Sequence, residues 1–82
     1  DRGKMIVFIM INTSAGAEEE VFDQISKMEG VLEAHLVYGV YDIIVKADIG
    51  EARDKEKEDV VGKIRQLKKV QSTMTLVVIK SH

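Results

Sequence analysis

The feature that most restricts the fold of this chain is one order of segments that occurs twice within 82 residues. Each half contains an apolar, β-branched run, then turn residues, then apolar residues at helical spacing, and then a second β-branched run. The helix ends are marked by MEGV at 28–31 and LKKV at 67–70, and each leads into a strand at its valine. The sequence therefore predicts the order strand, helix, strand in both halves.

We expect strands at 4–12, 31–38, 41–48 and 70–80, and helices from Glu18 to Gly30 and over 50–67. The apolar positions of each helix fall on one face. They are Val21, Phe22, Ile25 and Met28 in the first helix, and Val60, Val61, Ile64 and Leu67 in the second. Two split β-α-β units form the ferredoxin-like arrangement, an α+β fold with a four-stranded antiparallel sheet and both helices on one face.

The two middle strands are separated by Gly39 and Val40. Glycine at the first position of a two-residue loop fits a type II′ hairpin turn, which requires a positive φ there. Asp42 follows at the start of the next strand. Carboxylates are depleted in strands and costly to bury without a partner, so local structure does not explain this residue. Asp42 is therefore a candidate binding residue.

The first and last strands of the chain are apolar on both faces. The run from Met5 to Ile11 contains no polar residue, and Leu76 to Ile79 are also all apolar. In a monomer, the sheet face away from the helices meets water and should alternate apolar with polar residues. A large exposed apolar face indicates association, and a twofold contact covers it most simply. We therefore expect an obligate homodimer that packs face to face, as in dimeric α+β barrels.

Composition excludes several other classes of protein. We treat 1–82 as a single domain, in which 1–4 is either a native lead-in or a remnant of cloning. The absence of cysteine excludes disulfides and thiolate metal sites, and no cofactor is expected. The net charge of −2 argues against direct nucleic-acid binding. No segment has the length of a membrane span or the pattern of a signal peptide, so we expect a cytoplasmic protein without membrane contact.

Three motifs carry a resemblance to a known family. They are EGV at 29–31, VYGVYDIIVKA at 37–47 with glycine shortly before an aromatic residue and Asp42, and STMT at 72–75. From about Met5 to Lys80, the chain resembles the effector-binding (RAM) domain of the Lrp/AsnC feast/famine regulators, in the form that lacks a DNA-binding part. The resemblance implies dimers that assemble into rings, commonly octamers, and a free amino acid bound between dimers. It leaves two roles open, namely mixed assembly with full-length regulators and buffering of the amino acid.

An amino-acid pocket requires an acceptor for the ammonium, donors for the carboxylate and an apolar slot for the side chain. The hairpin and the last strand supply all three. We expect the ligand to contact Tyr38, Gly39, Val40, Tyr41, Asp42, Thr73, Met74 and Thr75. Asp42 would accept from the ammonium, backbone N–H groups near Gly39 and Val40 would donate to the carboxylate, and the hydroxyls of Thr73 and Thr75 would complete the polar ring. Tyr38, Tyr41 and Met74 would shape the apolar part of the pocket.

The second helix departs from the family pattern. Arg53 to Asp59 form an unbroken charged run where relatives place apolar residues at helical spacing. Without an apolar stripe, such a run cannot pack on a sheet. We interpret it either as a late helix start or as a solvated helix face with i,i+4 pairs such as Lys55 with Asp59.

Three other functions are weighed against the amino-acid sensor. The first is a small dimeric α+β barrel enzyme, either a cofactor-independent oxygenase or a haem-dependent type, in which His35 would be the base or ligand. His35 has no visible acid partner in the sequence, which disfavours chemistry. The second is an ACT-type sensor, which usually has an aspartate and a proline-glycine pair where this chain has 12–16. The third, RNA binding on the open face, would require several stacking aromatics, and the outer strands offer Phe8 alone.

Overall fold

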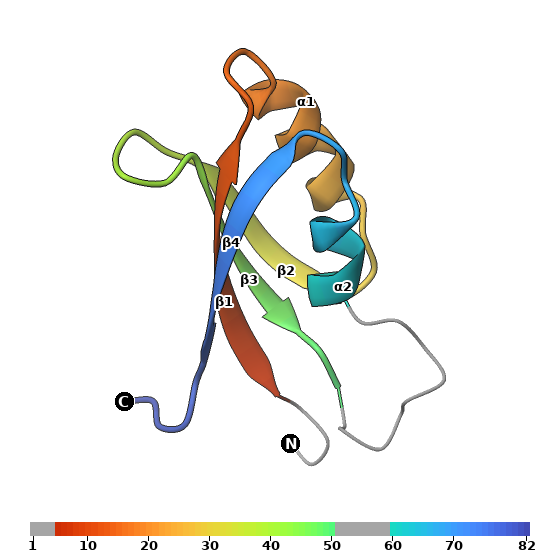
Figure 1. Ribbon diagram of the computed structural model, residues 1–82. Coiled ribbons are helices and arrows are strands. Elements are labelled where there is room, and N and C mark those ends of the chain that lie inside the picture. The colour runs from red at the N-terminus through yellow and green to blue at the C-terminus, as the bar shows by residue number, and fades with distance from the viewer. Residues whose placement is uncertain (1–4, 51–59) are drawn as a thin grey trace.

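The computed structural model describes residues 5–50 and 60–82. Along the chain these form β1 (Ile6–Thr13), α1 (Glu18–Ser26), β2 (Val31–Leu36), β3 (Ile43–Asp48), α2 (Val60–Arg65) and β4 (Val70–Val77). The strands make one antiparallel sheet in the order β2-β3-β1-β4, and both helices cover the same face of it (Figure 1). The ferredoxin-like α+β fold predicted from the repeated strand-helix-strand order is confirmed.

The first helix starts at Glu18 as predicted, but it ends at Ser26 and not at Gly30. Three glutamates occupy its first turn, where the helix dipole favours negative charge, and Val21 and Ile25 are buried. The turn that follows α1 leads into β2 through Gly30, which has φ +97°. A Cβ atom at Gly30 would lie 3.1 Å from the carbonyl oxygen of Asp48, so glycine is required here both for the backbone conformation and for close packing.

The core lies between the sheet and the helices. Alternate residues of β1 and β3 point to the helices and have no exposed surface, because successive side chains of a strand point to opposite faces. The buried apolar side chains are Val7, Ile9, Ile11, Ala17, Val21, Ile25, Ile43, Val45, Ala47, Val60 and Ile64. As predicted, the apolar stripes of both helices face this core, with Phe22, Met28, Val61 and Leu67 partly buried against it.

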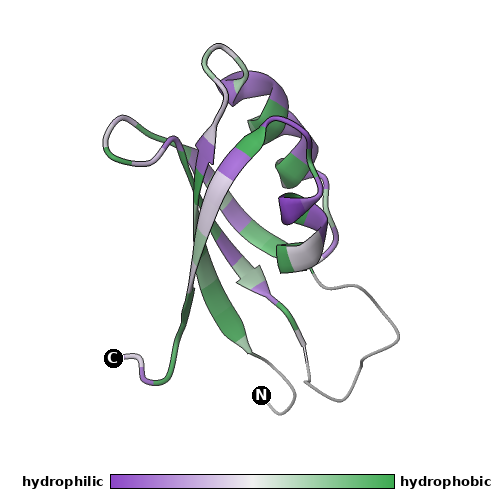
Figure 2. Cartoon of the chain, in the orientation of Figure 1, coloured by the Kyte–Doolittle hydropathy of each residue, from purple (hydrophilic) through white to green (hydrophobic). Residues whose placement is uncertain are grey.

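The other face of the sheet, here called the open face, carries no helix (Figure 1). The strand register places Phe8, Met10, Met74 and Leu76 together on it, and Met74 and Leu76 are 48% and 45% exposed. Hydrophobic colouring runs along β1 and the end of β4 in Figure 2. The β2 side of the open face is charged instead, because Glu33 is paired with Lys46 in the register. The predicted apolar character therefore holds for the β1 and β4 side of this face.

The predicted two-residue hairpin turn is wrong. Strand β2 ends at Leu36 and β3 begins at Ile43, so the connection is a loop over 37–42, closed by a hydrogen bond from the Val37 N–H to the Asp42 carbonyl at 2.9 Å. Gly39 has φ +152°, which is positive as expected but far from the value near +60° of a type II′ turn. The ladder stops early because the Asp42 N–H donates to the Ile11 carbonyl, which ties that residue to β1.

Other boundaries differ by a few residues. Strand β1 reaches Thr13 instead of residue 12, and β4 ends at Val77 instead of residue 80. Of the second helix, the structure describes Val60–Arg65 and a turn after it. The charged run at 53–59 lies outside the described residues, so its predicted conformation is untested.

Candidate functional site

Asp42 lies where the 37–42 loop meets the central strands. Its carboxylate Oδ2 accepts a hydrogen bond from the Thr13 N–H at 2.9 Å and a longer one from the Thr13 hydroxyl at 3.4 Å. Thr13 is buried, with 6% of its surface exposed. Asp42 is therefore explained by a tertiary contact that local sequence does not show, since its carboxylate satisfies a buried backbone donor at the end of β1.

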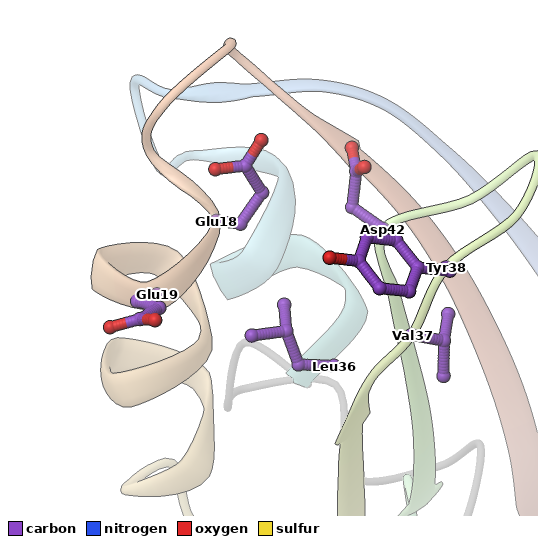
Figure 3. Close-up of a pocket in the computed structure, with 6 residues that line it drawn as sticks. All are labelled: Glu18, Glu19, Leu36, Val37, Tyr38 and Asp42. Carbon is purple, nitrogen blue, oxygen red and sulfur yellow. The ribbon is translucent and has the colours of Figure 1, made fainter.

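An open pocket of about 480 Å³ lies between the start of α1 and the 37–42 loop (Figure 3). Its lining consists of Glu18, Glu19, Leu36, Val37, Tyr38 and Asp42. The Oδ1 atom of Asp42 accepts no hydrogen bond from the described part of the chain, so one carboxylate oxygen remains available to a ligand. The pocket thus combines acceptors with an apolar wall.

The charge of this pocket is negative. Among the described residues, no basic side chain lines it, whereas three carboxylates do. The neighbouring Glu20 is neutralised by Lys69, whose Nζ lies 2.8 Å from its Oε1. Glu18 accepts only a 3.4 Å bond from the Gly16 N–H, and Glu19 forms no ion pair with residues of 5–50 or 60–82. The pocket is therefore suited to a ligand group that is positively charged.

The eight predicted ligand residues do not converge on this pocket. Asp42 and Tyr38 line it, whereas Gly39 and Val40 lie at the exposed tip of the loop. Neither Thr73, Met74 nor Thr75 lines the pocket. These three alternate across β4, and only Met74 lies on the open face, opposite Met10 in the register. Within one subunit, Thr73 and Thr75 therefore lie on the opposite face of the sheet from Met74.

Tyr41 belongs to the open face instead of the pocket. Its hydroxyl lies 3.6 Å from the Met74 Sδ, which acts as a weak acceptor. Thr75 is paired with Ile9, on the helix side of the sheet, and its hydroxyl oxygen is buried with no hydrogen-bond partner in the described part of the chain. Tyr41 and Thr75 are thus on opposite faces of the sheet.

Four pocket residues were not predicted as ligand residues, namely Glu18, Glu19, Leu36 and Val37. Glu18 and Glu19 lie in the first turn of α1, where the helix dipole favours their negative charge. Their second role follows from topology, because in a β-α-β-β order the start of the helix and the hairpin lie at the same end of the sheet. The predicted fold therefore contained a signal that these acidic residues face the loop.

His35, the candidate base of the alternative enzyme, lies on the β2 side of the open face and not in the pocket. Its Nε2 is 3.2 Å from Oε1 of Glu33, and Lys46 Nζ is 3.8 Å from the other oxygen of the same carboxylate. The statement that His35 has no acid partner is therefore wrong. The side chains of His35, Lys46 and Glu33 are 59%, 36% and 52% exposed. They therefore form a cluster of charges on the surface.

Neither a metal centre nor a membrane helix is found among residues 5–50 and 60–82. No three side chains of His, Asp or Glu gather there in a metal-binding group. The helices in that part of the chain are too short and too polar to cross a bilayer.

Comparison with known proteins identifies the class. The model of the Lrp/AsnC ligand binding domain matches residues 6–82. The fold is thus that of a small ligand-binding domain of ferredoxin-like topology. The chain belongs to the Lrp/AsnC family.

The curated relatives are HTH-type transcriptional regulators. An uncharacterized one from Pyrococcus furiosus is 38% identical over 72 residues, which is 87% of this chain and 47% of that protein. Another, from Pyrococcus abyssi, is 32% identical over 78 residues, or 95% of this chain and 50% of that protein. The chain thus spans about half the length of the curated relatives it matches.

Solved structures agree with this family. FFRP-DM1 is 37% identical with a TM-score of 0.80, and the match covers 92% of this chain and 99% of that one. A hypothetical protein from Pyrococcus horikoshii is also 37% identical, with a TM-score of 0.78 and coverage of 95% and 93%. E. coli AsnC is 27% identical with a TM-score of 0.79, and the match covers 94% of this chain and 52% of AsnC.

Proposed function

We propose that this domain binds a free amino acid in the pocket beside Asp42, and that binding shifts the assembly of copies of the chain. The pocket at the 37–42 loop is the observation that carries the proposal. Membership in the Lrp/AsnC ligand-binding domains supports a small-molecule ligand, and the curated relatives connect the domain to transcription regulation. We propose a non-enzymatic sensor that acts in the cytoplasm.

In this proposal, the ammonium of the amino acid binds Oδ1 of Asp42, with Glu18 and Glu19 adding negative charge nearby. The ligand side chain packs on Leu36, Val37 and Tyr38, which supply the apolar wall. The remaining requirement is a donor for the ligand carboxylate.

Backbone N–H groups at Gly39 and Val40 are candidates for that donor. The hydrogen bonds that hold the loop in place use the N–H groups of Val37 and Asp42 instead, so the two at the tip are not needed for loop closure. A second subunit can also supply the donor, because the pocket is open to solvent.

Assembly in this proposal starts with a face-to-face homodimer through the open face. Phe8, Met10, Met74 and Leu76 would be covered, which removes apolar surface from water at about 25 cal/mol per Å². Dimers would then join into higher rings, of which the octamer is the expected size. The ligand can shift these populations only by binding one assembly state more tightly than another.

The proposal assigns DNA binding to full-length regulators of the same family. Mixed assembly with them would carry the amino-acid signal to DNA. If mixed assembly does not occur, the remaining role is buffering of the free amino acid.

A thermal-shift screen of the twenty amino acids tests ligand binding. At least one should raise the melting temperature, increasingly with concentration above its dissociation constant. L-Met belongs in the panel because a regulator from Neisseria meningitidis with the same fold, 20% identical, has been solved as an L-Met complex. Failure of all twenty to stabilise the protein would contradict the proposal.

Asp42→Asn locates the binding site, because asparagine keeps a carbonyl oxygen for the Thr13 N–H and removes the negative charge. We expect at least a tenfold weaker affinity in Asp42→Asn, since a hydrogen bond to a charged group contributes about 1.5–3 kcal/mol. Asp23→Asn is the matched control. It removes a carboxylate from the exposed surface of α1 that does not line the pocket.

A further inference from the structure

The pocket beside Asp42 holds more negative charge than one ammonium group can balance. Its lining includes the carboxylates of Glu18, Glu19 and Asp42, and the described residues contribute no basic side chain to it. A free amino acid with an uncharged side chain carries one ammonium and one carboxylate, so its net charge is zero. Such a ligand would therefore leave the negative charge of this pocket uncompensated.

The two glutamates of the pocket also have little compensation from the rest of the described chain. Glu18 accepts a long backbone hydrogen bond of 3.4 Å, and Glu19 forms no ion pair in the part of the chain that the structure describes. Lys69 is bound to Glu20, with 2.8 Å between Nζ and Oε1. Both pocket glutamates are therefore available to a cation supplied by the ligand.

The carboxylates lie on two sides of the pocket. In Figure 3, Glu18 and Glu19 extend from α1 on one side, and Asp42 lies on the other. Leu36 and the ring of Tyr38 lie between them. The volume of about 480 Å³ is within the range of roughly 300–1,000 Å³ that is typical of small-molecule sites. A ligand that spans this pocket would meet an acceptor at each end and apolar surface in the middle.

We propose that the pocket selects amino acids with a cationic side chain, namely lysine or arginine. This inference rests on the amino-acid site of the proposed function and adds the charge of the ligand to it. The α-ammonium binds Oδ1 of Asp42, and the side-chain cation binds Glu18, with Glu19 adding negative charge nearby. The aliphatic part of the ligand packs on Leu36, as the stems of long cationic side chains do on apolar surface.

Two features of the pocket wall favour a cation over a neutral group. Glu18 is half-buried, so salt screens its interaction with a cation less than it would on the open surface. The exposed ring of Tyr38 offers an aromatic face that attracts an ammonium or guanidinium group. An acidic ligand side chain would instead lie beside carboxylates of the same sign, which selects against aspartate and glutamate.

Isothermal titration with lysine and with norleucine isolates the side-chain charge, because norleucine has the same carbon chain without the terminal ammonium. Lysine should bind at least tenfold more tightly, as expected for a hydrogen bond between charged groups. This affinity ratio should fall as the salt concentration is raised. Norleucine that binds as tightly as lysine would overturn the charge preference and leave the amino-acid site standing. Failure of all twenty amino acids to bind would instead refute the proposed function.

Glu18→Gln tests where the side-chain cation binds, because glutamine keeps the shape of the side chain and removes its charge. The ratio of lysine affinity to norleucine affinity should fall about tenfold. A merely structural effect would weaken both ligands alike, and an unchanged ratio would overturn the assignment of Glu18. Glu29→Gln is the matched control and should keep the wild-type ratio. It removes the same charge from the exposed turn after α1, outside the pocket.

Cadaverine, the diamine that remains when lysine loses its carboxylate, tests whether the ligand is an amino acid. It should bind more weakly than lysine, because the backbone N–H groups proposed as donors at Gly39 and Val40 would have no carboxylate to bind. Cadaverine that binds at least as tightly as lysine would overturn the proposal, since the pocket would then be a site for diamines.

Discussion

The carboxylate of Asp42 accepts a hydrogen bond from the Thr13 N–H at 2.9 Å, which joins the loop between β2 and β3 to the end of β1. The same residue lines the pocket with its side chain and donates its own N–H to Ile11. Asp42 therefore has a structural role and a proposed ligand role, and experiments on it have to separate the two.

Asp42→Ala should lower the free energy of unfolding by about 1–3 kcal/mol, because the buried Thr13 N–H loses its acceptor. Asp42→Asn should retain most of that stability. Urea denaturation of both variants measures the difference, with Asp23→Ala on the surface of α1 as a control expected within about 0.5 kcal/mol of wild type. Equal stability of Asp42→Ala and wild type would show that the Thr13 contact is not stabilising.

Gly30→Ala should be more destabilising than Gly16→Ala. Both glycines have positive φ, +97° and +84°, and alanine in that region costs about 1–2 kcal/mol. Only at Gly30 would the new Cβ also meet a backbone atom, the Asp48 carbonyl at 3.1 Å, whereas nothing lies within 4 Å at Gly16. Thermal unfolding of the two variants isolates the contact, and equal losses of stability would contradict its importance.

Met10→Lys should produce a folded monomer. The substitution places a charge in the centre of the open face, between Ile44 and Met74 in the register, without entering the core. Light scattering should show the loss of dimer, and circular dichroism should retain the wild-type spectrum. Lys46→Gln, on the charged side of the same face, is the control and should remain dimeric. A dimeric Met10→Lys would exclude the open face as the interface.

Much of the fold followed from local pattern. The order of elements and the apolar stripes of the helices were predictable because helix and strand periodicities differ. Gly30 was predicted as the residue that directly follows the first helix, but α1 ends at Ser26 and Gly30 belongs to the turn before β2.

The connection between β2 and β3 was predicted less accurately than the order of elements. The length of the 37–42 loop depends on bonds from Asp42 to Ile11 and Thr13, which lie about thirty residues earlier, and no local pattern encodes such contacts. Thr73 and Thr75 do not line the pocket of one subunit, and a motif that is contiguous in the sequence alternates across a strand. That Glu18 and Glu19 line the pocket could be predicted only from the topology of the fold, and not from the residues next to them in the sequence.

The most direct test of the account is to map where an amino acid binds. Amide chemical shifts of the ¹⁵N-labelled protein, recorded during titration with each of the twenty amino acids, report contact residue by residue. We expect at least one amino acid to perturb saturably the amides of Val37, Tyr38 and Asp42 and those of Glu18 and Glu19, at the opposite wall of the pocket. The absence of saturable shifts with all twenty, or shifts confined to residues far from this pocket, would contradict the proposed amino-acid site.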